Sequence, residues 1–344
     1  IYFWQIYKRW NYHTERKTAM KKILLFIKHI INIVSFSIRD GVEFVKITEM
    51  GGVNDKITRR QFELTVGIHS LEKGLSYKTK KKRFGESKAV KQLRTLLDYL
   101  RNGYPQKCYA VLETIAVVKE YLRYKDSIGE NNAEIKALFG ECKSLLHDVS
   151  DNYCSAGVEV VKKDTFMIKD QETIGTLFKN TRSIRNFNKA EKVTEQEILS
   201  AIEFAKTAPS ACNRQPSKVY YTMDENKNKE ISKLVPGNRG FEDEIPNFLV
   251  VTSAKNYFGL FEYNQWYVNG GIFLGYLRLA LRAVGLGHCI FQWSLQADEK
   301  ALRNLCNIPQ GEAIIAIVGI GHYADVSSCI KAQRKSTSEY IYKF

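Results

Sequence analysis

The spacing of apolar residues changes halfway along this 344-residue chain, and that change constrains the fold most. Before about residue 150, apolar side chains recur every three or four positions, which is the spacing of amphipathic helices. The helices expected there cover residues 23–48, 55–75, 87–102, 108–125 and 131–147. Because no alternating or continuous apolar run interrupts this pattern, the first part is predicted to be all-helical.

Strand patterns are confined to the second half. Residues 219–222 and 248–252 are short apolar or aromatic runs, and 313–319 is a continuous apolar run typical of a buried strand. The helices expected around them cover 173–179, 194–208 and 264–284, and the second opens with a capping box from Thr194 to Glu197. A mixture of this kind predicts an α+β domain.

Three segments are therefore predicted along the chain. A basic and aromatic tail covers 1–22, a helical region covers 23–165, and the α+β domain covers 166–344. The chain begins with Ile1, and Met20, which precedes two lysines and an apolar run, is an alternative start.

The net charge of +15 is concentrated at the front of the chain. Residues 1–100 hold 21 basic and 9 acidic side chains, a net of +12, and the other 244 residues carry only +3. A basic front suits anionic lipid, nucleic acid or a polyanionic substrate, and a solvated face explains it equally well. No zinc-finger, RNP or helix-turn-helix pattern is present, so a specific nucleic-acid partner is not expected.

The apolar run from Ile23 to Ile38 is the one segment that suggests a membrane. Lys28, His29 and Asn32 interrupt it, so it is too short and too polar for a membrane span. An amphipathic helix lying on a membrane or on the protein's own core fits better, which makes residues 1–40 a candidate for peripheral membrane contact.

Cysteine and histidine usage argues against a metal centre. The seven cysteines form no C-x-x-C pair, and the six histidines lack metal-ligand spacing. Reduced thiols and a cytoplasmic location, with or without membrane association, are the expected state. We also find no G-x-G-x-x-G after a strand, so no dinucleotide-binding Rossmann unit is predicted.

Four motifs in the second half occur in a fixed order. They are Thr181–Phe187 (T-R-S-I-R-N-F), Ala208–Pro216 (A-P-S-A-C-N-R-Q-P), Ala283–Gly287 (A-V-G-L-G) and Ile308–Gly311 (I-P-Q-G), the last followed by a strand and Gly319-Ile320-Gly321. In register, they resemble the FMN-dependent nitroreductase family over roughly 173–340. The resemblance implies a central, mostly antiparallel sheet flanked by helices, and a homodimer with FMN at its interface. It also implies a hydride passed from NAD(P)H through FMN to a small electron-poor acceptor, with no catalytic side chain.

The resemblance assigns one set of residues to the phosphate of FMN and another to its ring. Arg182, Ser183 and Arg185 belong to the opening motif, and their charges and hydroxyl suit a phosphate. A basic residue after the last strand shares these contacts in the family, and Arg334 is the first choice here, before Lys331 and Lys335.

The flavin ring calls for a different set of contacts. Amides suit its pyrimidine edge, and the loop offers Asn213 and Gln215, beside Ser210 and stiffened by Pro209 and Pro216. In the family, the segment after the A-V-G-L-G motif lies against one flavin face. The matching residues are Cys289, Phe291, Gln292 and Trp293.

Some residues depart from the family pattern. Thr181 stands where arginine is frequent, Ser217 where an aromatic residue is common, and Asn269-Gly270-Gly271 where many members carry an acidic residue. Two glycines there are expected to weaken the long helix by up to about 1 kcal/mol each. These departures leave open a catalytically silent scaffold with this fold, or a basic membrane or polyanion binder, as alternatives to an oxidoreductase.

The helical region carries a further motif, His69-Ser70-Leu71-Glu72-Lys73-Gly74-Leu75. It resembles a segment of longer bacterial nitroreductase-like proteins with a helical N-terminal extension, which are often associated with surface-polysaccharide genes. His69, Glu72 and Lys73 lie within two helical turns and could approach the flavin cavity; a helix end is the simpler interpretation. The basic loop 78–83 is expected to be solvated, with an anionic substrate as the alternative.

Overall fold

A computed structural model describes residues 2–49, 53–78, 80, 84–147, 158, 170–294 and 297–344. Contacts divide the chain into two compact units, Ile1–Gly52 and Val53–Phe344, which are described separately. The predicted boundary between residues 165 and 166 and most of the basic loop 78–83 lie outside the described residues.

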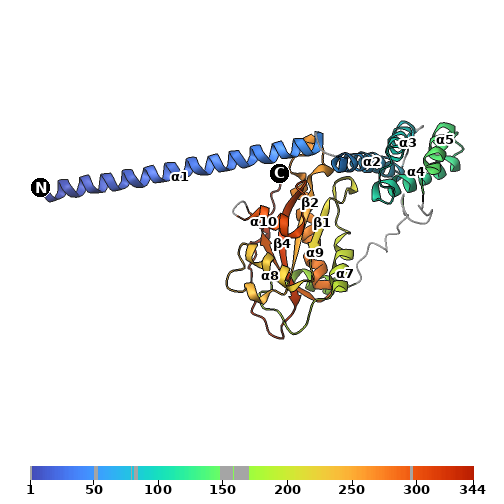
Figure 1. Ribbon diagram of the computed structural model, residues 1–344. Helices are drawn as coiled ribbons and strands as arrows, with labels where there is room; N and C mark the ends of the chain where they lie inside the picture. Colours follow the sequence, from blue (N-terminus) through green and yellow to red (C-terminus); the bar gives the residue numbers. More distant parts are fainter. Residues whose placement is uncertain are drawn as a thin grey trace. The chain divides into compact units, whose positions relative to one another are not determined.

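The first unit is one long helix, α1 (Tyr2–Glu49), drawn in blue in Figure 1. The tail expected over 1–22 is part of this helix, because no proline or glycine precedes Gly41 in the chain. Many aliphatic side chains between Met20 and Val45 are exposed. Among the described residues, no helix combines the length and apolar character that a membrane crossing requires.

The second unit begins with a helical part that confirms four predicted helices. They are α2 (Val53–Leu75), α3 (Glu86–Arg101), α4 (Tyr109–Ser127) and α5 (Ala133–Ser144). One apolar stripe of each helix faces a shared core built around Leu64, Leu93, Val117 and Ile135.

The rest of the second unit is built on a four-stranded antiparallel sheet in the order β1-β2-β4-β3 (Figure 1). The strands are β1 (Ser217–Tyr221), β2 (Asn247–Ala254), β3 (Leu286–Gln292) and β4 (Glu312–His322). This confirms the predicted α+β class with a central antiparallel sheet. The apolar pattern does not predict β3, because Gly287 and His288 interrupt it.

Helices cover both faces of the sheet. They are α6 (Gln171–Asn180), α7 (Glu195–Ala205), α8 (Glu225–Leu234), α9 (Gln265–Ala283) and α10 (Glu299–Cys306). On one face Ile231 and Leu302 pack against Phe248, and on the other Ile198 and Leu277 pack against Val251. The predicted capping box at the start of α7 is present between Thr194 and Glu197.

Candidate functional site

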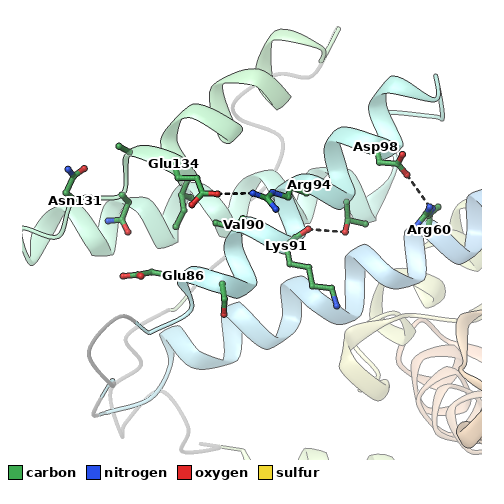
Figure 2. Close-up of a pocket in the computed structure, with 13 residues that line it drawn as sticks. Arg60, Glu86, Val90, Lys91, Arg94, Asp98, Asn131 and Glu134 are labelled. Atoms are coloured by element: carbon green, nitrogen blue, oxygen red, sulfur yellow. Dashed lines mark hydrogen bonds and ion pairs between the residues drawn. The ribbon is translucent and has the colours of Figure 1, made fainter.

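A pocket of about 1010 Å³ lies on the helical part, lined by residues of α2, α3 and α5 and of the turn before α5 (Figure 2). Its charged side chains pair with one another: Arg60 lies 3.2 Å from Asp98, and Arg94 lies 3.1 Å from Glu134. These pairs neutralise the charge that would otherwise attract an ionic ligand. The residues predicted to bind a cofactor lie elsewhere, in the α+β part.

The loop formed by residues 209–215, here called the amide loop, has an unusual backbone. Cys212, Asn213 and Gln215 have φ angles of 50°, 51° and 53°, in the left-handed region. Asparagine tolerates this conformation, whereas for cysteine and glutamine it costs of order 1 kcal/mol or more each. Strain of this kind persists only where the surroundings impose it, and it is concentrated at functional sites.

Hydrogen bonds from two side chains hold the amide loop. The Oδ1 atom of Asn269 on α9 accepts a bond of 2.8 Å from the backbone N–H of Ala211. The hydroxyl of Ser210 accepts a bond of 2.9 Å from the N–H of Gln215, so the loop is closed on itself. Asn213 and Gln215 are thereby presented with their amide groups exposed.

Arg214 fastens the amide loop to its neighbours. It is 4% exposed and donates to both carboxylate oxygens of Glu262, at 2.9 and 2.8 Å. Burial alone would raise the pKa of Glu262, but hydrogen bonds from Arg214 and from the N–H of Gly259 outweigh it and lower the pKa. The guanidinium also lies 4.9 Å from the ring centre of Phe62 on α2 and 5.4 Å from that of Phe258, so the helical part is tied to this loop.

A pocket of about 490 Å³ opens beside the amide loop. Pro209, Ser210 and Gln215, all predicted cofactor residues, line it together with Phe273 of α9. Lys206 and Lys218 also line this pocket, and each is paired with a carboxylate, Lys206 with Glu203 and Lys218 with Glu312. Its size and mixed lining suit a small organic ligand.

The structure explains why asparagine and glycine occupy positions 269 and 270 of α9, which the sequence alone does not. Asn269 is 5% exposed and holds the amide loop. A Cβ atom on Gly270 would lie 2.5 Å from Cγ1 of Ile315, so glycine allows α9 to approach β4 closely. Gly271 has no such neighbour within 4 Å. Gly270 therefore has a packing role in addition to the weakening of the helix expected for both glycines.

A second group of residues gathers around the C-terminal half of α9. Arg278 donates to the carbonyl of Thr181 at 3.3 Å, and Arg282 donates to that of Asn180 at 2.8 Å. The pKa of Arg278 is lowered, first by burial and then by the positive charges of Arg334 and Arg182. Arg182, Arg278, Arg282 and Arg334 are called the arginine edge below.

Two members of the arginine edge, Arg182 and Arg334, are predicted from the sequence, and the structure brings both near Arg278. Arg278 and Arg282 are not predicted. The one sequence feature that could have pointed to them is that these two arginines lie one turn apart on a largely apolar helix. Thr181, which stands where arginine is frequent, is buried and donates its hydroxyl to the carbonyl of Leu177.

His288 of β3 lies beside the arginine edge and is 2% exposed. Burial, followed by the charges of Arg278 and Arg282, lowers its pKa to about 4. Its Nδ1 atom is buried and has no hydrogen-bond partner within the described part of the chain. The backbone N–H of Ile184 donates to the His288 carbonyl at 2.8 Å, which fixes the opening motif along β3. A neutral buried histidine among guanidinium groups fits an edge that receives an anion.

The remaining predicted residues lie along β3. Ser183 forms an isolated bridge with His288, and its side chain is exposed. The Arg185 guanidinium lies 5.8 Å from the ring centre of Phe241. Gln292 is exposed at the end of β3, and Trp293 packs against the core of that face.

A single chain does not bring all of these residues together. Asn269, which holds the amide loop, and Arg278 of the arginine edge are nine positions apart on α9. That spacing corresponds to about 13 Å along the helix axis and to opposite sides of the helix. The predicted cofactor residues therefore form two groups, one at each half of α9.

Comparisons with known proteins agree with these motifs. The model of the nitroreductase family matches residues 178–238. A protein of Archaeoglobus fulgidus with the provisional name NADH dehydrogenase/NAD(P)H nitroreductase is 24% identical over 165 residues, which are 47% of this chain and 92% of that protein. The FMN reductase [NAD(P)H] of Bacillus subtilis is 28% identical over 163 residues, which are 43% of this chain and 64% of that protein.

Solved structures give a similar result. A nitroreductase-like protein from Streptococcus mutans has a TM-score of 0.45 at 16% identity, over 51% of this chain and 99% of that chain. The nitroreductase family protein of Streptococcus pneumoniae has a TM-score of 0.42 at 21% identity, over 50% of this chain and all of that chain. The sequence matches leave about half of this chain uncovered, as an N-terminal extension would. The C-terminal part of this chain thus contains a nitroreductase family domain.

Proposed function

We propose that this chain is an FMN-dependent oxidoreductase of the nitroreductase type, which passes a hydride from NAD(P)H to a small electron-poor acceptor. When bound, FMN would supply the hydride chemistry, and the protein would supply position and charge. The observation that carries the proposal is the arginine edge of a nitroreductase family domain, beside which His288 is buried with an Nδ1 atom that has no hydrogen-bond partner among the described residues. The names of the Bacillus subtilis relative and of a Clostridium difficile neighbour, an FMN-dependent nitroreductase, agree with this cofactor.

The arginine edge would bind the phosphate of FMN. Burial and mutual repulsion already act against the charge on Arg278, so a doubly charged anion would relieve an unfavourable arrangement. Arginine forks donate charge-assisted hydrogen bonds to phosphate, and Ser183 adds a hydroxyl from the same motif. These contacts would position the cofactor without taking part in electron transfer.

The amide loop would bind the ring of the cofactor. The amides of Asn213 and Gln215 are exposed on a backbone that Asn269, Ser210 and Arg214 hold in one conformation. Amides offer both donors and acceptors, as the pyrimidine edge of a flavin requires. Because the loop is held before any ligand binds, little conformational entropy is lost on binding.

We further propose a homodimer in which the arginine edge of one copy meets the amide loop of the other. The two groups lie at opposite halves and sides of α9, and a second copy can complete each site. Val268, Ile272 and Tyr276 form an exposed apolar stripe on α9, each between 38% and 52% exposed. Gly271 and Gly275, which have nothing within 4 Å of a Cβ position, would allow close approach of another helix along this stripe.

The first experiment is the visible spectrum of the purified protein, followed by heat denaturation and identification of the released chromophore. We expect FMN in a ratio close to one per chain, and NAD(P)H oxidation that depends on an added quinone or nitro compound. A protein that takes up no FMN contradicts the proposal. FMN without any turnover instead favours the catalytically silent scaffold.

Two variants test the site more sharply. Arg278→Ala should weaken FMN binding by about 10- to 100-fold, the value of one charge-assisted hydrogen bond. Arg94→Ala is the control, because Arg94 is paired with Glu134 on the helical part. Mixed dimers of Arg278→Ala with Asn213→Ala chains should recover one intact site each if two copies share a site. No recovery would place both groups of one site within one chain.

A further inference from the structure

The helical part contributes a side chain to the amide loop. Tyr109 is the first residue of α4, and its hydroxyl accepts a hydrogen bond of 2.8 Å from Nδ2 of Asn213. Gln215 also interacts with this hydroxyl. Tyr109 is 37% exposed, so its hydroxyl lies at the surface of the loop that presents the two amides.

One turn further along α4, Glu113 lies on the same face as Tyr109. The Glu113 carboxyl and the Tyr109 hydroxyl form a hydrogen bond, in which Tyr109 donates while Glu113 is ionised and the protonated carboxyl can donate in turn. Glu72, from the middle of the predicted motif on α2, is close enough to Glu113 to act on its charge. His69, one turn before Glu72, has its Nδ1 atom 3.7 Å from a Glu72 carboxylate oxygen.

The electrostatics of this cluster favour a proton on Glu113. Burial, followed by the negative charge of Glu72, raises the pKa of Glu113 to about 7, against the opposing effect of the hydrogen bond from Tyr109. Burial and the charges of Glu113 and Glu72 also raise the pKa of Tyr109, which keeps its hydroxyl protonated. The groups that face this pair are Glu72 from α2 and the neutral amides of Asn213 and Gln215 from the loop. A carboxyl group that titrates near neutral pH is suited to proton transfer.

We propose that Tyr109 and Glu113 form a proton relay through which the helical part supplies the proton that accompanies the hydride. This rests on the proposed function, since hydride delivery to an electron-poor acceptor leaves an anion that must be protonated. The Tyr109 O–H bond breaks as the new bond to hydrogen forms on the acceptor. The proton of Glu113 then passes to the Tyr109 oxygen, and water reprotonates the Glu113 carboxylate. Tyr109 is the catalytic residue, and Glu113 acts through it as a positioning residue.

The relay gives the motif at 69–75 a role. The negative charge of Glu72 favours the protonated form of Glu113. The helical extension would then be part of the active site, which no comparison with nitroreductases of half this length reveals.

The test compares Glu113→Gln with Glu120→Gln, a control on the same helix whose carboxylate pairs with Arg123. Turnover of the wild-type protein should fall above about pH 7. Glu113→Gln should lower kcat by about 100-fold and abolish this break, with FMN content and the KM for NAD(P)H unchanged. Tyr109→Phe should lower kcat similarly. An unchanged pH profile in Glu113→Gln, with FMN still bound, overturns the relay.

A second measurement needs neither cofactor nor turnover. The Glu113 pKa is raised on folding, so stability is greatest below about pH 4.5 for this group and is lost as the pH rises to about 7. We expect this loss between pH 5 and 7 in the FMN-free wild-type protein and in Glu120→Gln, but not in Glu113→Gln. Identical pH dependence in all three overturns the relay. A chain that shows this titration but binds no FMN contradicts the proposed function separately.

Discussion

The amide loop and the arginine edge are built in contrasting ways, although α9 supports both. The amide loop is strained but fully held: three left-handed residues are fixed by Asn269, Ser210 and the buried Arg214–Glu262 pair. At the arginine edge, like charges lie close together and lower the pKa of Arg278 and His288. One half of the candidate site is therefore shaped before a ligand arrives, and the positive charge of the other would be offset by an anion.

The contrast shows that two regions of one fold can offset an unfavourable energy in different ways, one by packing and the other by binding a ligand. Strain in the amide loop must be offset by packing, and the helical part provides some of that packing through Phe62 and Tyr109. Repulsion at the arginine edge can be offset by a ligand instead, which links the folded state to the cofactor. Removing a side chain that holds the amide loop should therefore lower the stability of the protein at any pH. The arginine edge should lower it chiefly at acidic pH, where His288 would gain a positive charge.

The largest effect on stability is expected for Arg214→Ala. It would remove two of the hydrogen bonds that Glu262 accepts, and the guanidinium contacts of Phe62 and Phe258. We expect a loss of roughly 3 kcal/mol in the free energy of unfolding, at the low end for a buried pair because Glu262 is partly exposed. Urea denaturation measures this. Arg123→Ala, which breaks an exposed pair, should change stability by less than about 1 kcal/mol. Equal losses of stability in the two variants would show that the Arg214–Glu262 pair does not stabilise the amide loop.

A smaller effect should appear at the arginine edge on acidification. The pKa of His288 in the folded protein, about 4, lies below its ordinary value, so the unfolded chain binds the proton first as the pH falls. The stabilisation is complete above about pH 6.5, and about 2 kcal/mol should be lost by pH 5. His288→Gln should remove this loss, and the exposed His147→Gln should not. The same acid sensitivity in wild type and His288→Gln would contradict the buried, neutral histidine.

A third effect concerns α9, which spans both regions. Gly270→Ala should destabilise the protein by about 1–3 kcal/mol, because the new methyl group would meet Ile315. Gly140→Ala on α5 is the matched change, since nothing lies within 4 Å of its Cβ position. It should stabilise the protein by up to about 1 kcal/mol. Thermal unfolding of both variants checks the difference in sign, and a stabilising Gly270→Ala would refute the close approach of α9 to β4.

Features that depend on short-range spacing were predictable from the sequence. The helices α2, α3, α4, α5 and α9 follow from apolar periodicity, and the cap of α7 from four consecutive residues. The strand β4 follows from one unbroken apolar run. The sequence also indicates Arg182 and Asn213, because both belong to contiguous motifs.

Features that depend on distant parts of the chain were not predictable. Arg278 and Arg282 look like surface residues of α9 until Asn180 and Thr181 are seen beside them. Tyr109 has no motif of its own, and it is 104 positions away from the Asn213 that it contacts. The strand β3 depends on pairing with β4, which compensates for its weak apolar pattern.

Local sequence order and tertiary environment therefore determine different properties of this protein. The order of side chains along the chain is enough to specify the helices, the α+β class and the family motifs, since each depends on neighbours a few positions away. The charge states of His288 and Glu113 depend on burial and on charges from other elements. Those neighbours exist only once α2, α4, α9 and β3 have packed, because desolvation and Coulomb interactions act through space and not along the sequence.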